Sequence, residues 1–266
     1  MKLAATIAAA AVSASAATSN PLHNTKLNIP TITIAPTVEM PLQGLGTWEY
    51  NDTVAEAAVT AALDMGYTHI DTALGYDNQE GIARALKATS RPRDSYFITS
   101  KIPGGQNHSA ATASLDLALE QLGLDYVDLM LTHFPATWEG EGGKEMRLQT
   151  WAALEDFVRA GKARAIGVSH YCIQHIKDIL EVNTIPVAIN QVQYHVGMGT
   201  AVPNATDGIE WDWAHGITYE SFSPLCGPCD GSDHWELING TLVTSIGAKY
   251  NKTGCVSQHS DDDDDE

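Results

Sequence analysis

An alternation of helix and short apolar strand is the feature that most constrains the fold of this chain. In the first unit, Thr53 and Glu56 have the spacing of a capping box, and Gly66 is expected to end the helix. The expected apolar face of that helix consists of Val54, Ala58, Ala61 and Met65. A short strand at 68–71 follows, and the same order recurs with a helix at 109–123, a helix that carries Leu148 to Val158 and ends at Gly161, and strands at 126–131 and 163–168. Strands without polar alternation, each reached through a helix, predict a parallel sheet covered by helices.

Such a sheet either stays open or closes into a barrel. An open dinucleotide-binding sheet needs a Gly-x-Gly-x-x-Gly turn after an early strand. The segment 44–48 reads GLGTW and lacks the third glycine, which favours the barrel. The segment 31–39, between Pro30 and Pro41, is expected to form a β-hairpin that covers the other end of that barrel. We therefore predict an α/β fold of the (β/α)8 TIM-barrel type with an N-terminal β-hairpin.

Polar residues stand where the expected strands end. They are Asp71, Lys101, His133, Ser169, Gln191 and the pair Phe222-Ser223. In a parallel barrel these ends converge on one face, which is where barrel enzymes carry their chemistry.

Charge and composition exclude several classes of partner. The formal net charge is −18, with 15 Lys and Arg against 33 Asp and Glu, so a nucleic-acid partner is not expected. No strongly apolar run is long enough to span a membrane. Four cysteines are too few for a disulfide scaffold. We expect a monomer that binds a small molecule.

The two ends of the chain differ from the rest. Residues 1–17 combine Lys2, an alanine-rich apolar stretch and an Ala14-Ser15-Ala16 cleavage pattern, which predicts a signal peptide and secretion. A frayed alanine-rich helix on a cytoplasmic protein is the alternative. Residues 259–266 are mostly acidic and are expected to form a solvated tail. The folded part is therefore placed at 18–258.

Seven segments of the chain resemble the aldo-keto reductase family, in family order. They read MPLQGLGTW (40–48), HIDTALGYDNQEGIARAL (69–86), FITSK (97–101), VDLMLTHFP (127–135), GVSHY (167–171), INQVQYH (189–195) and SFSPL (221–225). The resemblance implies a barrel, an NADP cofactor, with NAD left open, and reduction of an aldehyde or ketone to an alcohol.

The resemblance also assigns four catalytic positions. Hydride delivery to a carbonyl carbon builds negative charge on its oxygen, so a proton donor must stand beside that oxygen. Tyr76 is the expected donor, and Lys101 is expected to lower its pKa. Asp71 holds Lys101 in place as an ion partner, and His133 positions the substrate oxygen. Taken singly, each residue has an ordinary structural explanation, and the set in family order favours the catalytic one.

The cofactor positions depart slightly from the family. Ser169 and Gln191 match residues that hydrogen-bond the nicotinamide amide, and His170 stands where asparagine is commoner. Phe222 replaces the usual tyrosine that stacks on the nicotinamide ring, a change that keeps the aromatic face. Ser223 and Leu225 match contacts to the pyrophosphate, although plain core packing would also explain Phe222 and Leu225. No metal site is predicted.

Beyond residue 258 the family pattern is not continued. The family's eighth βα unit and its grip on the adenosine 2′-phosphate are missing, so we expect a truncated barrel with weak cofactor binding. Cys226 and Cys229 form a Cys-Gly-Pro-Cys motif in the loop after the seventh strand. Two interpretations of this motif are left open, a thiol oxidoreductase site and a local disulfide.

The leading functional prediction is an NAD(P)H-dependent reductase of an aldehyde or ketone. The alternative from another class is a non-catalytic barrel, either degenerate or used as a binding subunit. Trp48, Tyr50 and Trp138 are expected at the mouth of the pocket, and ordinary surface aromatics would explain them equally well.

Overall fold

The structure is a computed structural model, and it describes residues 27–195, 205–224 and 239–253. The predicted signal peptide, the acidic tail, Leu225, Cys226 and Cys229 lie outside these residues. Within them, none of the helices has the length and apolar character needed to cross a lipid bilayer.

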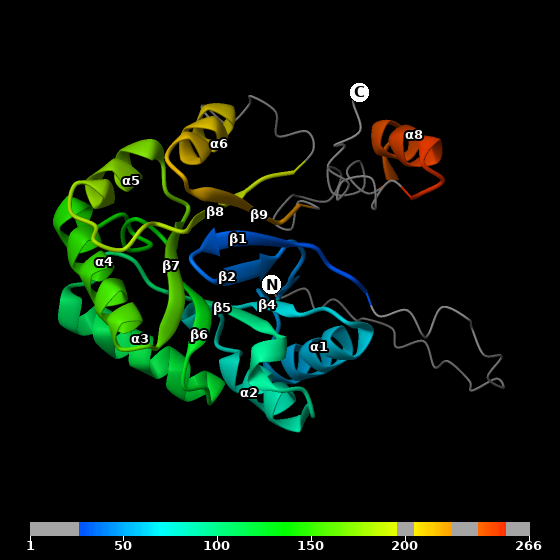
Figure 1. Cartoon of the computed structure of the whole chain (residues 1–266), viewed down its shortest axis with the longest axis horizontal. Helices are drawn as coiled ribbons and strands as arrows, with labels where there is room; N and C mark the ends of the chain where they lie inside the picture. Colours follow the sequence, from blue (N-terminus) through cyan, green and yellow to red (C-terminus); the bar gives the residue numbers. More distant parts are fainter. Residues whose placement is uncertain (1–26, 196–204, 225–238, 254–266) are drawn as a thin grey trace, which may run out of the picture.

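Seven parallel strands form one sheet in sequence order, β3 to β9, which curls into a nearly closed barrel (Figure 1). The strands are β3 (Leu45–Gly46), β4 (His69–Asp71), β5 (Phe97–Ile102), β6 (Val127–Thr132), β7 (Ala163–Ser169), β8 (Ile189–Gln193) and β9 (Thr218–Phe222). The helices are α1 (Asp52–Met65), α2 (Gln79–Ala88), α3 (His108–Leu122), α4 (Gly143–Arg159), α5 (Ile173–Leu180), α6 (Ala205–Ala214) and α8 (Thr241–Lys249). The predicted barrel is confirmed. In the described part of the chain β3 and β9 are the sheet edges.

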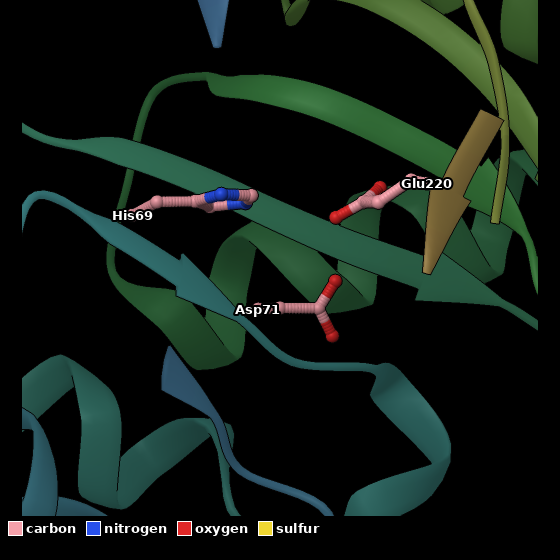
Figure 2. Close-up of side chains that lie close together, drawn as sticks. All are labelled: His69, Asp71 and Glu220. Atoms are coloured by element: carbon pink, nitrogen blue, oxygen red, sulfur yellow. The ribbon is translucent and has the colours of Figure 1, made fainter. Parts of the chain in front are cut away.

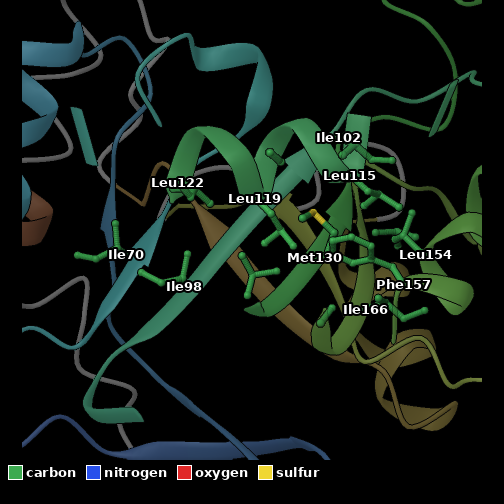
Figure 3. Close-up of a cluster of buried hydrophobic side chains, with 14 of the residues drawn as sticks. Ile70, Ile98, Ile102, Leu115, Leu119, Leu122, Met130, Leu154, Phe157 and Ile166 are labelled. Carbon is green, nitrogen blue, oxygen red and sulfur yellow. The ribbon is translucent and has the colours of Figure 1, made fainter. Parts of the chain in front are cut away.

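Alternate residues of each strand face two different layers, as strand geometry requires. Outward residues of the sheet, such as Ile98, Met130 and Ile166, pack against Leu115 of α3 and Leu154 of α4 (Figure 3). These side chains belong to the main apolar core, which fills the space between the sheet and its surrounding helices.

The expected hairpin is present as β1 (Thr31–Ala35) and β2 (Val38–Pro41), which pair antiparallel. Its Val38 and Met40 form a second buried cluster with inward residues of the barrel, including Phe97 and Leu129. Phe97 opens β5, so the hairpin covers the end at which the strands begin. The opposite end of the barrel is left for the site.

The beginning of the first helix differs from the prediction. The side chain of Asn51, not Thr53, accepts the capping hydrogen bond, from the Val54 amide at 2.9 Å. Asn51 is a strong capping residue, and α1 therefore starts at Asp52. The predicted apolar face is wrong, because Val54 is 44% exposed and Met65 is 57% exposed. The buried face consists of Ala55, Val59, Ala62 and Leu63.

The later helices follow the predicted pattern more closely. In α3 the cap is Asn107, whose side chain accepts from the Ala110 amide, and Gly123 ends the helix in the left-handed conformation. The buried face of α3 contains the predicted Leu115, Ala118, Leu119 and Leu122. Helix α4 extends from Gly143 to Arg159 and contains the predicted Leu148, Trp151, Ala152, Glu155 and Val158.

Candidate active site

Four polar residues from separate elements meet at the end of the barrel where the strands finish. Asp71 is the last residue of β4, Lys101 lies near the end of β5, and His133 directly follows β6. Tyr76 ends a short 3₁₀ turn, Leu74–Tyr76, that begins three residues after β4. The structure therefore brings together the four side chains for which a catalytic role is predicted.

A buried asparagine shapes the turn that carries Tyr76. The Asn78 side-chain amide donates to the backbone carbonyls of Thr47 at 2.7 Å and Tyr50 at 2.9 Å. Its Oδ1 accepts from the Thr72 hydroxyl at 3.2 Å. These bonds fasten the loop after β4 to the loop after β3. The sequence analysis missed Asn78, although the segment that carries the resemblance includes it.

Lys101 is the centre of the polar group. It is only 1% exposed, and its ammonium ion-pairs with Asp71 Oδ1. The same nitrogen donates to the Thr72 carbonyl at 3.0 Å and lies 3.5 Å from the Tyr76 hydroxyl. Burial lowers the pKa of Lys101, but Asp71 and Tyr76 outweigh that effect and raise it, so the side chain remains an ammonium.

The pKa of Tyr76 moves in the direction opposite to the prediction. Burial disfavours the phenolate and raises this pKa, and the negative charge of Asp71 acts in the same direction. Lys101 lowers it, as expected, but by less. The sequence argument considered the charged neighbour and left out the loss of hydration. The Tyr76 hydroxyl is consequently protonated at neutral pH and is available as a hydrogen-bond donor.

His133 is neutral in the same environment. Burial, together with the positive charge of Lys101 and the neighbouring His170, lowers the His133 pKa to about 3. The ring stacks on Phe134 with centroids 4.4 Å apart and meets the Tyr76 ring edge-on at 5.5 Å. A neutral imidazole held between two aromatic rings can offer one N–H to a substrate oxygen beside Tyr76.

Of the predicted cofactor residues, His170, Gln191, Phe222 and Ser223 line the same opening, and Ser169 is buried behind them. Ser169 ends β7, and its hydroxyl donates to the Gln191 carbonyl at 2.9 Å. His170 has a positive φ of 59°, and its Nδ1 lies 3.1 Å from the His133 carbonyl oxygen. The His170 ring lies 4.9 Å from that of Phe222, centroid to centroid. Ser223 follows Phe222 with a φ of 51° and also lines the opening.

Gln191 has a partner that the sequence did not predict. Its side-chain Nε2 donates to Asp71 Oδ2 at 2.8 Å, which joins two residues 120 positions apart. Asp71 thus accepts from Lys101 with one oxygen and from Gln191 with the other. Gln191 connects the predicted cofactor wall to the predicted catalytic group.

A cavity of about 1200 Å³ opens above these residues. Its polar floor includes Asp71, Tyr76 and His133. Aromatic residues form much of the wall: Trp48, Tyr50, Phe134, Trp138 and Phe222. The predicted place of Trp48, Tyr50 and Trp138 at the pocket is therefore confirmed. Such a cavity suits a small molecule with a polar reacting group and an apolar remainder.

A second carboxyl, that of the half-buried Glu220, also lies at the barrel interior, and the sequence analysis missed it. Donor atoms of Glu220, His69 and Asp71 all lie within 4.8 Å of one another (Figure 2). Glu220 is two residues before Phe222 on β9, so strand alternation places both on the inward face. That alternation was the signal that the sequence contained.

The donor atoms of Asp71 and His69 are already engaged, which disfavours a metal ion there. Both Asp71 oxygens accept hydrogen bonds, from Lys101 and Gln191. His69 Nδ1 lies 3.3 Å from the Pro41 carbonyl oxygen, and Nε2 lies 2.9 Å from the Thr99 hydroxyl. An adjacent ammonium would also repel a cation.

The fold and the site together define a parallel barrel with a polar group at the carboxyl ends of its strands. The profile of the Aldo/keto reductase family matches residues 42–225. The chain is 36% identical to a glyoxal reductase from Bacillus subtilis over 220 residues, which are 81% of this chain and 72% of that protein. It is 35% identical to the methylglyoxal reductase DkgA from Yersinia pestis over 214 residues, 80% of this chain and 72% of the relative. The chain belongs to the aldo-keto reductase family.

A solved structure extends this comparison to the fold. The structure of a Bombyx mori aldo-keto reductase in complex with NADP superimposes with a TM-score of 0.72 at 26% identity. The match covers 86% of this chain and 78% of the other. Aldo-keto reductases act on small carbonyl compounds, and homologues of this chain bind NADP(H).

Proposed function

We propose that this protein reduces small aldehydes or ketones with NADPH, with Tyr76 as the general acid. The observation that carries the proposal is the contact between the Lys101 ammonium and the Tyr76 hydroxyl, 3.5 Å apart, on the floor of an aromatic-walled cavity. Asp71 holds Lys101, and His133 stands beside Tyr76. The alternative cofactor is NAD.

The residues along the cofactor wall fit a nicotinamide dinucleotide. Phe222 and His170 present flat rings to the cavity, and Gln191 offers polar atoms next to them. These three residues would hold the nicotinamide, with Ser169 supporting Gln191 through a hydrogen bond, and Ser223 would contact the pyrophosphate. When bound, the cofactor supplies a hydride to the carbonyl carbon.

The chain's own residues would then supply the proton to the carbonyl oxygen. A carbonyl oxygen in the cavity accepts hydrogen bonds from the protonated Tyr76 hydroxyl and from the neutral His133 ring. As negative charge develops on that oxygen, the Tyr76 proton moves to it and a phenolate remains. The fixed charge of Lys101 stabilises this phenolate in a site shielded from water. Asp71 keeps the ammonium in place throughout.

Tyr76→Phe tests the proposal. NADPH oxidation is followed by absorbance with glyoxal, methylglyoxal and an aromatic aldehyde as substrates. General acid catalysis is worth about 10²- to 10⁴-fold, so the kcat of the variant should fall by at least about 10²-fold. NADPH binding, measured by fluorescence titration, should change little, because the phenol contributes mainly to the chemical step.

Tyr67→Phe is the matched control, because Tyr67 lies between α1 and β4, packs against the core and does not line the cavity. It should leave the rate unchanged. Two results contradict the proposal. One is a Tyr76→Phe variant that retains the wild-type rate, and the other is a wild-type protein that binds NADPH but oxidises it with none of the carbonyl compounds. The second result would support the non-catalytic barrel.

A further inference from the structure

Glu220 is a half-buried residue whose carboxyl the proposed mechanism does not use. It lies in the middle of β9, in register with Gln191 of β8. Its Oε2 atom is buried and has no hydrogen-bond partner in the described part of the chain. A carboxyl oxygen buried without a partner is costly, so its presence next to the site calls for an explanation.

Glu220 lies next to the ion pair that supports Tyr76. Gln191, whose side chain donates to Asp71 Oδ2, is the residue paired with Glu220 on the neighbouring strand. Donor atoms of Glu220 and Asp71 lie within 4.8 Å of each other. Figure 2 shows Glu220 and Asp71 pointing toward each other from β9 and β4.

The charges around Glu220 do not balance if every acid is ionised. Among the described residues, Lys101 from β5 is the only cation that acts on Glu220, while Asp71 from β4 is a second acid. His69 from β4 is neutral, since burial lowers its pKa more than Asp71 raises it. Two carboxylates and one ammonium would leave an uncompensated negative charge in the barrel interior. One of the two acids therefore keeps its proton.

The acid that keeps its proton is Glu220. Asp71 forms the ion pair with Lys101, whereas Glu220 has the oxygen without a partner. Burial and the negative charge of Asp71 raise the pKa of Glu220 to about 8, against the smaller opposing effects of Gln191 and Lys101. At neutral pH Glu220 is mostly a neutral carboxylic acid.

We propose that Glu220 is a positioning residue of the reductase site, which in its protonated form leaves Asp71 as the only counter-ion of Lys101. The Lys101 ammonium then stays beside the Tyr76 hydroxyl, where it stabilises the phenolate. When Glu220 loses its proton, a second negative charge interacts with the Lys101 ammonium. The ammonium then stabilises the Tyr76 phenolate less. This inference rests on the proposed function for the roles of Lys101 and Tyr76.

The pH profile of Glu220→Gln tests the positioning role. Glutamine has the size of a protonated glutamic acid and carries no charge at any pH. The wild-type kcat should fall as the pH rises through the Glu220 pKa of about 8, down to the lower rate of the form with ionised Glu220. The variant should keep its neutral-pH rate and lose this limb of the profile. Glu210→Gln, at an exposed position on α6, is the control and should retain the limb.

Infrared difference spectroscopy tests the protonation state without any measurement of activity. The wild-type protein should show a band of a buried carboxylic acid at pH 7 that disappears as the pH rises through about 8. The band should be absent from Glu220→Gln. Asp212 is another acid of the described residues with a raised pKa. Its pKa is about 6, so it loses its proton at a lower pH than Glu220. Because the wild-type titration needs no variant, this measurement still applies if Glu220→Gln fails to fold.

The outcomes separate this inference from the proposed function. A wild-type spectrum without a carboxylic acid that titrates near pH 8 overturns the role of Glu220, whether or not the protein is a reductase. An unchanged pH profile in a folded Glu220→Gln also overturns it. A titrating band in a protein without reductase activity overturns the proposed function and, with it, the positioning role, while the protonation of Glu220 stands.

Discussion

Glu155→Gln should lower the free energy of unfolding substantially, because Glu155 connects two parts of the helical layer around the barrel. Glu155 lies on α4, and its side chain is 8% exposed. The carboxylate accepts from the backbone amides of Thr184 at 2.6 Å and Ile185 at 2.9 Å, and from the Trp151 indole at 3.1 Å. Arg159 forms an ion pair with it at 2.9 Å. These bonds fasten α4 to the loop that leads into β8.

The magnitude follows from the pKa of Glu155. Burial raises this pKa, but the hydrogen bonds of Ile185 and Thr184, with that of Arg159, outweigh burial and lower it from 4.5 to about 2. One pKa unit corresponds to about 1.4 kcal/mol, so the ionised carboxylate contributes about 3 kcal/mol to the free energy of unfolding at neutral pH. Because the folded pKa lies below the unfolded one, this contribution is complete above pH 4.5 and is lost as the pH falls toward 2.

Urea denaturation followed by circular dichroism measures the effect. At pH 7 Glu155→Gln should lower the free energy of unfolding by about 3 kcal/mol, and the difference from wild type should shrink at each step below pH 4.5. Glu120→Gln, at an exposed position on α3, is the control and should change it by less than about 0.5 kcal/mol. A loss below about 1 kcal/mol at pH 7, or a difference that stays constant with pH, would refute the reasoning.

Two further predictions concern buried polar groups. Because the His133 pKa lies at about 3, nitrogen NMR should find its ring neutral from pH about 5 to 8, and a protonation step in that range would contradict the account of burial. Asp128, whose side chain is 2% exposed, pairs with Arg93 and Arg164 and accepts from the Ile98 amide. Asp128→Asn should cost about 3 kcal/mol in urea denaturation, and a loss under about 1 kcal/mol would mean that water replaces the carboxylate.

The sequence predicted the convergence of the site because convergence follows from topology. Asp71, Lys101 and His133 each end or follow a parallel strand, and the carboxyl ends of such strands meet on one face of a barrel. Apolar periodicity and helix-ending glycines were sufficient to predict that the three strand–helix units exist. They failed at the start of α1, where Asn51 and Thr53 both resemble caps and only the packed helix face decides between them.

What the sequence did not predict depends on contacts between distant residues. The bond from Gln191 to Asp71 and the proximity of Glu220 exist only once the sheet has curled. The raised pKa of Tyr76 likewise reflects how completely the folded protein surrounds the phenol, which a list of charged neighbours does not contain. Burial depends on the whole fold, so reasoning from sequence patterns predicted the wrong direction for the pKa shift of Tyr76.

The bond between Gln191 and Asp71 also bears on how the protein loses activity. It crosses the interior from β8 to β4, so the site depends on the curvature of the sheet as a whole and not on any single strand–helix unit. A slight uncurling at the edges β3 and β9 would separate these side chains while the helices stayed intact. During gradual denaturation, catalysis should therefore cease at lower denaturant concentrations than those that melt the helices.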